Sequence, residues 1–339
     1  MGGTRMKIRV GIIGYGTISS KYHRTALGER ADRFELAAIH DTTPARQQAA
    51  RNETDATVYD ALDEFLATDI DLVLVAAPTV YHTELARAGL EAGKAVVVEK
   101  PMGMNASELE PLLAAARNDG AFLTVHHNRR WDPDYRTVRS IVERGEIGDV
   151  LTVESRANGL GAPHKYGAAD YHPQWRLEAQ YGGGKLNEWG SHLIDQALQW
   201  FGSDIDSVWG QLRNVGLSTE VDTYGKYVIG FSSGVLYHIE TSWISPVPEP
   251  RWYVLGSEGA VLKATPNPDE PAQIVRRTDD GTNEPTVDCI HTGGHGAFYD
   301  NLYEVLANGA RSAVLPEEGA LVTRVIEAVR ESSRTGKAV

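Results

Sequence analysis

The stretch KIRVGIIGYGTISS, residues 7–20, decides the fold. Its first half, residues 7–13, is rich in β-branched side chains and predicts a buried strand, which stops at Gly14-Tyr15-Gly16. The residues that follow, TISSKYHRTALGE, have helical character. A dinucleotide site requires this order of strand, glycine turn and helix, because the positive end of the helix then faces the pyrophosphate.

The glycine pattern reads G-x-G-x-x-S, with Ser19 where Gly or Ala is usual. Gly14 permits the tight turn, and Gly16 lets the backbone approach a pyrophosphate, with Thr17 and Ile18 completing the predicted cofactor loop. Ser19 is small enough to keep the helix close to the strand. We predict a dinucleotide site here, and the alternative is a plain turn between a strand and a helix.

The next predicted strand, residues 34–40, ends at Asp41, where an acidic residue meets the adenosine ribose in such sites. A carboxylate accepts hydrogen bonds from both ribose hydroxyls and repels a 2′-phosphate, so Asp41 favours NAD over NADP. Thr42 follows in place of a basic residue, and Arg46 is the nearby cation within reach of a phosphate. We predict that Asp41, Thr42 and Arg46 contact the cofactor.

Strands and helices alternate through the first third of the chain. Further strands are predicted at residues 57–59, 71–76, 95–98 and 121–125. Nearly continuous apolar strands separated by helices indicate a parallel sheet covered on both faces, with ligands at the carboxyl ends of the strands. The sequence therefore predicts a doubly wound, Rossmann-type α/β domain over residues 1–127.

The rest of the chain, residues 128–339, predicts a second, α+β domain. Strand-like runs joined by turn signals such as SSG and GSEG indicate a mainly antiparallel sheet, at residues 150–156, 208–214, 224–231, 235–242, 251–255 and 259–263. Helices are predicted at residues 135–144, 295–308 and 317–335. Packing of the last helix against the first domain is one option.

Composition excludes several functional classes. The 339 residues are 42% hydrophobic, with no apolar run long enough to cross a bilayer and no secretory signal before the first strand, so we expect a cytoplasmic protein without a membrane partner. A net charge of −13 without a long basic block argues against nucleic acid as a partner. The single cysteine, Cys289, fits a reducing compartment.

Two further segments carry titratable groups. The strand at residues 95–98 ends in Glu99-Lys100-Pro101, which places Lys100 at the carboxyl edge of the sheet; a solvated charge is the alternative. Residues 181–195 read YGGGKLNEWGSHLID, and in a helix Glu188 and His192 share a face with Asp195 one turn further. The glycines predict close approach of this loop to cofactor or substrate, and a flexible linker before a core histidine is the alternative.

These segments together resemble the Gfo/Idh/MocA family of sugar and polyol dehydrogenases: VGIIGYG, AAPTVYH, AGKAVVVEKP, NRRWDPDY, GEIGDV, GGGKLNEWGSHLID and EEGALVTRVIEAVRESSRTGK. The resemblance covers nearly the whole chain in order and is greatest to scyllo-inositol dehydrogenase-like members. It implies a Rossmann domain followed by a domain with a large, mainly antiparallel open sheet. One face of that sheet carries the substrate pocket, and the other commonly carries the interface of a homodimer or homotetramer.

The resemblance implies roles for particular residues. Lys100 contacts the reacting hydroxyl and the cofactor, and His192 is the acid/base at the carbinol oxygen. Glu188 stands where most members have aspartate, which moves the carboxylate by one methylene and alters its hydroxyl contacts or its orientation of His192. Asp195 is a candidate for fixing the tautomer of His192, and a purely structural role for Asp195 is the alternative.

Other site residues are implied on both sides of the reaction centre. Cofactor contacts are implied for Ala77, Pro78, Thr79 in place of the common asparagine, His82, Glu99, Lys100, Asn128, Trp175 and Arg176. Substrate contacts are predicted for Lys100, Arg129, Trp131, Tyr166, Trp175, Glu188 and His192. Tyr166 lies in an aromatic loop whose rings suit the C–H face of a carbohydrate, and a loop packed by its own aromatics is the alternative.

The predicted reaction interconverts a secondary alcohol and a ketone on a cyclic polyol or sugar. Neutral His192 takes the hydroxyl proton while the hydride leaves carbon, and Lys100 stabilises the alkoxide. We expect NAD as the cofactor and no metal, since neither HExxH nor a paired-cysteine spacing is present. The alternatives are oxidation of a glycoside at a ring carbon to a 3-keto sugar and a non-catalytic, dinucleotide-binding regulatory protein.

Overall fold

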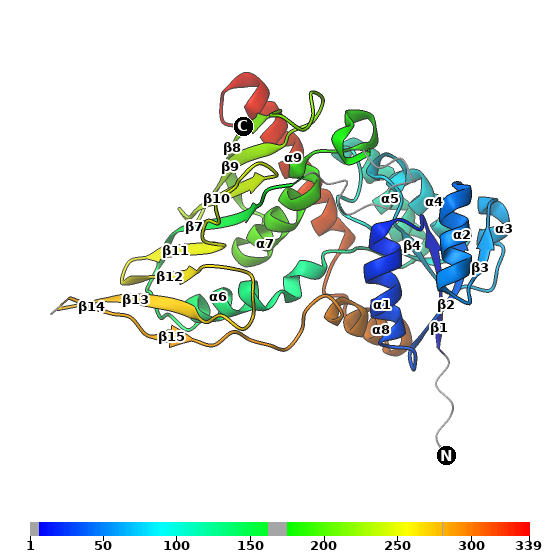
Figure 1. Cartoon of the computed structure of the whole chain (residues 1–339), viewed down its shortest axis with the longest axis horizontal. Helices are drawn as coiled ribbons and strands as arrows, with labels where there is room; N and C mark the ends of the chain where they lie inside the picture. Colours follow the sequence, from blue (N-terminus) through cyan, green and yellow to red (C-terminus); the bar gives the residue numbers. More distant parts are fainter. Residues whose placement is uncertain (1–6, 162–174, 280) are drawn as a thin grey trace, which may run out of the picture. The chain divides into compact units, whose positions relative to one another are not determined.

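The computed structural model describes residues 7–161, 175–279 and 281–339, which form two compact units (Figure 1). Among these residues, unit 1 takes in 7–127, 175–183 and 296–323. Unit 2 takes in 128–161, 184–279, 281–295 and 324–339. The division of the sequence into two domains, residues 1–127 and 128–339, stays a prediction.

Unit 1 contains the predicted parallel sheet. Its order is β3-β2-β1-β4-β5-β6, with β1 (Ile8–Ile13), β2 (Phe34–His40), β3 (Thr57–Tyr59), β4 (Leu72–Val75), β5 (Ala95–Val98) and β6 (Leu123–Val125). The chain runs outward from β1 in one direction and from β4 in the other, so the switch point lies between these two strands. All four residues of β4 are buried, as expected for a strand covered on both faces.

The helical segments of unit 1 lie between these strands and in two later stretches of the chain. They are η1 (Ile18–His23), α1 (Arg24–Gly28), α2 (Pro44–Glu53), α3 (Leu62–Leu66), η2 (Thr79–Tyr81), α4 (His82–Glu91), α5 (Ala106–Asp119), η5 (Trp175–Leu177), η6 (Ala179–Tyr181) and α8 (Ala297–Asn308). Asn105 begins α5 with a capping box, since its side chain accepts from Glu108 N and Glu108 accepts in return. The segment after the glycine turn differs from the prediction because η1 is a π-helix.

Unit 2 contains the predicted, mainly antiparallel sheet. Its order is β14-β13-β12-β11-β7-β10-β9-β8, with β15 paired to β13. The strands are β7 (Val150–Asn158), β8 (Ile205–Arg213), β9 (Tyr224–Phe231), β10 (Leu236–Ser242), β11 (Trp252–Gly256), β12 (Gly259–Lys263), β13 (Ala272–Thr278), β14 (Gly281–Asn283) and β15 (Thr286–Val287). Among the described strand pairs of this second sheet, only β7–β10 is parallel. The strands β13, β14 and β15 were not predicted from the sequence. The end of β13 and all of β14 consist of exposed residues, and β15 is only two residues long.

Helices cover one face of this sheet (Figure 1). They are η3 (Asn128–Trp131), α6 (Pro133–Glu143), η7 (Leu186–Gly190) and α7 (Ser191–Phe201). The end of α9 (Pro316–Thr335) also packs there, because Gly210 N donates to Ser332 Oγ at 3.0 Å. Tyr237 and Trp252 are fully buried in the core beneath these helices.

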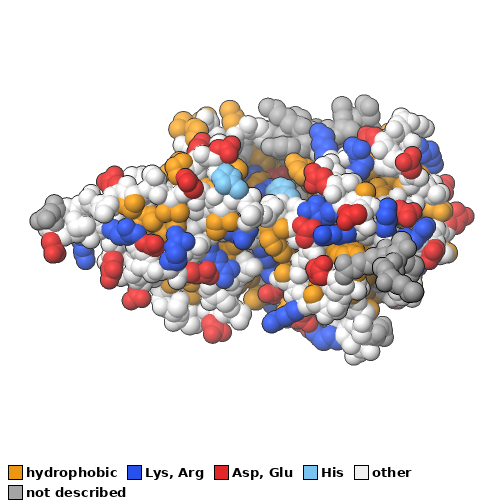
Figure 2. All heavy atoms as spheres, turned by 90° about the horizontal axis from the view of Figure 1, so that it is seen from below, with side chains coloured by type: hydrophobic (Ala, Val, Ile, Leu, Met, Phe, Trp, Pro, Cys, Tyr) orange, Lys and Arg blue, Asp and Glu red, His pale blue; other side chains and the backbone are white. Residues whose placement is uncertain are grey.

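No described helix combines the length and the apolar character needed to span a membrane. On the face drawn in Figure 2, acidic and basic side chains are interspersed. The charge distribution on this face therefore agrees with the sequence, in which positive charge is not concentrated.

Candidate functional site

The glycine turn brings β1 close to the end of β4. Gly14 has a φ of +91°, and a Cβ there would lie 2.9 Å from the backbone of Ala76 and Ala77. A Cβ at Gly16 would meet no described heavy atom within 4 Å, so a ligand has room over this residue. Ser19 Oγ donates to the Gly14 carbonyl at 2.5 Å, which ties the following helix to the turn and gives the departure from Gly or Ala a structural role.

Asp41 is buried at the end of β2 and supports the same turn. Its Oδ2 accepts from Tyr15 N at 2.7 Å, and its Oδ1 accepts from Thr43 N at 2.8 Å. Two oxygens with about four lone-pair positions can still accept from ribose hydroxyls. Thr42 is exposed, whereas Arg46 is buried and donates from Nη1 to the Tyr15 carbonyl at 3.2 Å. Arg46 is therefore directed at the protein backbone in this structure.

His82 links two loops at the carboxyl edge of the parallel sheet. Its Nδ1 lies 2.8 Å from the Pro101 carbonyl, and its Nε2 lies 2.9 Å from the Ala77 carbonyl. Burial lowers its pKa, so the neutral ring, which donates only one of these bonds, is favoured. Both ring nitrogens thus face protein carbonyls, and His82 positions the loop that carries Pro78 and the buried Thr79.

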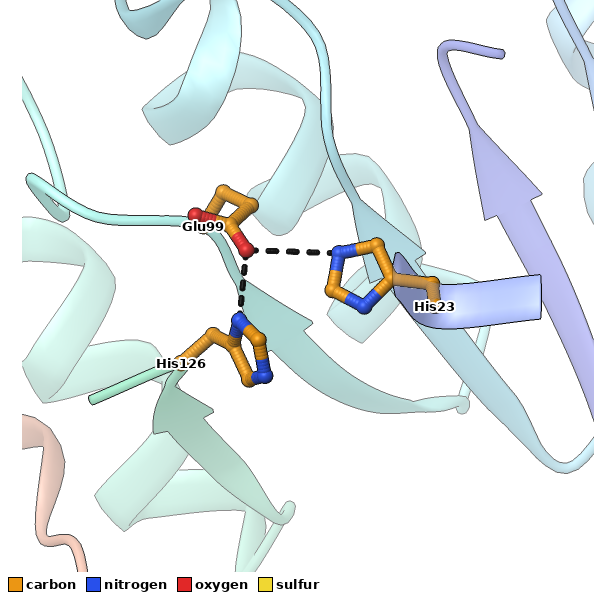
Figure 3. A group of neighbouring side chains, drawn as sticks. All are labelled: His23, Glu99 and His126. Carbon is orange, nitrogen blue, oxygen red and sulfur yellow. Dashed lines mark hydrogen bonds and ion pairs between the residues drawn. The ribbon is translucent and has the colours of Figure 1, made fainter. Parts of the chain in front are cut away.

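A buried network surrounds Glu99, the residue before Lys100 (Figure 3). Glu99 Oε1 lies 2.5 Å from His126 Nδ1 and 3.3 Å from His23 Nε2, and His23 Nδ1 lies 2.5 Å from the hydroxyl of Tyr299. Burial alone raises the pKa of the Glu99 carboxyl, but the two histidines lower it well below its usual value. An ionised Glu99 that accepts from both rings, with Tyr299 donating to His23, satisfies every one of these contacts.

The same three side chains offer ligand types that bind metals. One atom each of His23, Glu99 and His126 lies within 4.8 Å of the others. The hydrogen bond between Glu99 and His126 already uses two of these atoms, so a cation would have to displace the shared proton. The expectation of no metal site stays a prediction, and the convergence of these residues from η1 and from the ends of β5 and β6 was not foreseen from the sequence.

Lys100 is partly exposed beyond β5, and its backbone N donates to Glu99 Oε2 at 3.1 Å. The network around Glu99 therefore also fixes the backbone that carries the proposed catalytic lysine. The peptide bond from Lys100 to Pro101 is cis.

The three glycines of YGGGKLNE are each crowded by protein atoms. A Cβ at Gly182 would lie 2.6 Å from Met104 Sδ, and one at Gly183 would lie 2.4 Å from the Arg176 carbonyl oxygen. In unit 2, a Cβ at Gly184 would lie 2.4 Å from Asp222 Oδ1. The glycines thus permit close packing of protein segments, whereas sequence analysis assigned them to close approach of a ligand.

Glu188 and His192 lie across a junction between two helix types. Glu188 belongs to the π-helix η7, and His192 belongs to α7. His192 is buried, and its ring meets the Trp189 ring edge-on with centroids 5.9 Å apart. Single π-helical turns are frequent at functional sites, and both of the π-helices of the described chain carry residues singled out from the sequence.

Asp195 pairs with an arginine that sequence analysis did not single out. Arg130 Nε donates to Asp195 Oδ2 at 2.9 Å, and Arg130 Nη2 donates to Oδ1 at 2.6 Å. Both side chains are almost fully buried. Asp195 therefore ties α7 to η3, which is a structural role, and its support of the His192 ring stays a prediction.

Aromatic and charged side chains gather around Glu188 in unit 2. Arg129 lies 4.0 Å from the centre of the Trp189 ring and bonds Asp132 at 3.0 Å. Lys185 Nζ lies 3.3 Å from Glu188 Oε2. Sequence analysis missed Lys185 and Trp189, although both stand inside the GGGKLNEWGSH motif.

The remaining candidates lie in several places. In unit 1, Arg176 lies 4.4 Å from the centre of the Trp175 ring. Asn128 and Trp131 belong to η3 of unit 2, and the Trp131 carbonyl accepts from Gly294 N at 2.9 Å. Tyr166 lies outside the described residues.

Asp222 caps the segment that carries Glu188 and His192. Its Oδ2 accepts from Leu186 N at 2.7 Å, and its carbonyl accepts from Lys185 N at 3.0 Å. Burial raises the pKa of Asp222 to about 6, and the Leu186 N–H only partly offsets this effect. In the folded protein the carboxyl therefore stays neutral up to about pH 6, whereas in the unfolded chain it loses its proton at about pH 4.

This cap predicts a pH-dependent stability. A carboxyl group with a raised folded-state pKa stabilises the fold fully below its unfolded pKa of about 4, and the contribution is lost as the pH rises through about 6. A shift of about two units corresponds to roughly 3 kcal/mol. The free energy of unfolding, measured with urea between pH 4 and 7, should fall with rising pH in the wild type, and this contribution should be missing in Asp222→Asn. Equal pH dependence in the wild type and the variant would contradict the raised pKa of Asp222.

The fold and the placement of the site residues define the class of protein. A parallel sheet with an open glycine turn at its switch point and a buried acidic residue after the second strand is a dinucleotide-binding Rossmann domain. A second unit with a large, mainly antiparallel sheet carries the histidine and glutamate.

The chain belongs to the Gfo/Idh/MocA family of oxidoreductases. Residues 8–127 match the family model described as the oxidoreductase family with an NAD-binding Rossmann fold, and residues 135–262 match the GFO/IDH/MocA C-terminal domain. The resemblance seen in the sequence motifs is thereby confirmed. The predicted fold class, a Rossmann domain with a second domain built on a mainly antiparallel sheet, is confirmed as well.

Relatives and solved structures cover nearly the whole chain. The scyllo-inositol 2-dehydrogenase (NADP(+)) IolW of Bacillus subtilis is 30% identical over 98% of this chain and 95% of its own length. An NAD-binding protein from Listeria innocua has a TM-score of 0.87 at 32% identity, covering 98% of this chain and 97% of that one. The WlbA dehydrogenase of Bordetella pertussis, in complex with NADH and UDP-GlcNAcA, has a TM-score of 0.82 at 26% identity, covering 98% of each chain.

Proposed function

We propose that this oxidoreductase interconverts a secondary alcohol and a ketone on a cyclic polyol or sugar. The observation that carries the proposal is the buried His192 beside Glu188 and Trp189 in the C-terminal domain of a dehydrogenase family. An imidazole, a carboxylate and an indole suit a polyhydroxylated ring, whose hydroxyls are hydrogen-bonded while its C–H face packs on the aromatic ring. The relative named as a scyllo-inositol 2-dehydrogenase supports the same substrate class.

In this proposal the protein's residues manage the proton and the developing charge. A bound nicotinamide cofactor supplies the hydride acceptor. His192 removes the proton of the reacting hydroxyl, because a neutral imidazole is available as a base at physiological pH. The ammonium group of Lys100 stabilises the alkoxide that develops, an effect worth about 3 kcal/mol in comparable oxyanion sites. Glu188 accepts hydrogen bonds from other substrate hydroxyls.

We infer that NAD is the preferred cofactor. The buried Asp41 carboxylate at the end of β2 repels a 2′-phosphate, and the nearby Arg46 is directed at the Tyr15 carbonyl. The space over Gly16 fits a pyrophosphate at the start of η1. The relative from Bacillus subtilis is named for NADP(+), and the WlbA structure holds NADH, so the two cofactors must be compared directly.

A screen of inositols, monosaccharides and glycosides tests the proposed function. Each compound is incubated with the protein and either NAD or NADP, and NADH or NADPH formation is followed by absorbance. We expect turnover with at least one inositol or monosaccharide and a higher kcat/KM with NAD. Turnover with glycosides alone would favour the 3-keto sugar reaction, and tight NAD binding without any turnover would favour a regulatory protein.

We propose further that the protein forms a homodimer or homotetramer through the open face of its larger sheet. Trp209 on β8 and Leu236 on β10 point away from the buried residues next to them, and they are 38% and 47% exposed. Contiguous apolar patches on a surface mark interaction sites, and both side chains lie on the face that we propose for the interface. Light scattering of the purified chain measures the assembly, and a monomer would contradict this proposal.

A further inference from the structure

Lys185 is a buried ammonium group enclosed by two indoles. The residue is 5% exposed, and its Nζ lies 5.6 Å from the centre of the Trp189 ring and 5.3 Å from that of Trp243. Among the residues that the structure describes, Glu188 is its hydrogen-bond acceptor, at 3.3 Å. A buried charge is costly unless it is paired, so this lysine depends on the Glu188 carboxylate.

Trp243 holds the same carboxylate oxygen from another element. Its indole Nε1 donates to Glu188 Oε2 at 3.0 Å. Trp243 follows β10 and is 3% exposed, so its ring is fixed by the sheet. One oxygen of Glu188 is therefore held by a lysine at the start of η7 and by a tryptophan at the end of a strand.

The length of the Glu188 side chain decides whether these contacts form. An aspartate at this position would withdraw the carboxylate by about 1.5 Å, the length of one carbon–carbon bond. The 3.3 Å and 3.0 Å contacts would then both be lost without a rearrangement of the helix. Lys185 would remain as a buried cation without this acceptor, so lysine at 185 requires glutamate at 188.

We propose that Lys185 is a positioning residue for the reaction, holding the Glu188 carboxylate together with Trp243 where it accepts hydrogen bonds from the substrate. This inference rests on the proposed function. Burial lowers the pKa of Lys185, and the adjacent Glu188 partly offsets this effect, as expected for a cation retained by its partner. The pair Lys185–Glu188 is then a joint determinant of substrate preference, and neither residue can be exchanged alone without loss.

A double-mutant cycle of Lys185→Met and Glu188→Asp tests the proposal. Each variant and the double variant are assayed for kcat and KM with the best polyol from the screen, for NADH affinity by fluorescence, and for urea unfolding. We expect Lys185→Met to lower kcat/KM by about 10- to 100-fold, the range that a misplacement of roughly 1 Å produces. Glu188→Asp should cost at least fivefold less in the Lys185→Met background than in the wild type, while NADH affinity stays unchanged.

Lys263→Met serves as a matched control. Lys263 is also fully buried, but its Nζ donates to the carbonyls of Thr265 and Asn267, outside the proposed site. Its loss should lower stability without changing the kcat of the folded protein.

The outcomes separate the two proposals. If the loss of kcat/KM in the double variant equals the product of the losses in the two single variants, the positioning role is overturned, whether or not the unfolding energies are coupled. The proposed function would still stand, because the enzyme is active. A wild-type protein that turns over no polyol, sugar or glycoside would overturn the proposed function, and the role assigned to Lys185 with it.

Discussion

Replacement of His192 by alanine is expected to lower kcat by roughly 10²- to 10⁴-fold, the usual contribution of a positioned acid/base. The residue is buried on α7, and its ring packs edge-on against Trp189. Alanine removes the only atoms that could accept the hydroxyl proton at this position but leaves the helix backbone intact. NAD binding should survive, because the glycine turn and Asp41 belong to unit 1.

Steady-state kinetics and NADH fluorescence titration measure the two effects separately. His192→Gln is the useful companion variant, since it keeps a hydrogen-bonding side chain of similar reach but cannot act as a base near neutral pH. Retained turnover in both variants would remove His192 from the mechanism. A parallel loss of NADH binding would show instead that the substitution disturbs the fold.

Replacement of Arg130 by methionine is expected to destabilise the protein by roughly 3–5 kcal/mol. Arg130 and Asp195 form a two-point ion pair, and their side chains are 3% and 2% exposed. Removing only the arginine leaves the Asp195 carboxylate buried without its main partner, which costs more than the pair contributes over an apolar alternative. The midpoint of urea unfolding should therefore fall sharply.

The double variant Arg130→Met with Asp195→Leu is the decisive control for this pair. It removes both charges and fills a similar volume, so it should recover most of the lost stability. The pair Arg139–Glu143, at 2.7 Å on α6, has side chains that are 30% and 56% exposed and offers a comparison in which Arg139→Met should change stability by less than about 1 kcal/mol. Equal losses at the two arginines would contradict the account given for Arg130.

Much of the fold could be predicted because it depends on local pattern. The strands at residues 34–40, 57–59 and 95–98 have the predicted bounds, since each is a short run of mainly apolar, aromatic or β-branched residues. Strands β13 to β15 could not be predicted, because their later residues are polar and exposed and pairing alone makes them strands. The π-helices were also missed, since a periodic pattern over one turn does not distinguish them from α-helices.

The sequence by itself determined the order of strand, glycine turn and helix, the acidic residue after the second strand, and the family to which the motifs belong. Only the tertiary structure decided which partner each charged group has: Arg130 for Asp195, Lys185 and Trp243 for Glu188, and two histidines for Glu99. Backbone periodicity is a short-range property that neighbouring residues reveal. A buried charge is stabilised by whichever distant side chain the packing brings within hydrogen-bonding distance, and only the folded chain specifies that distance.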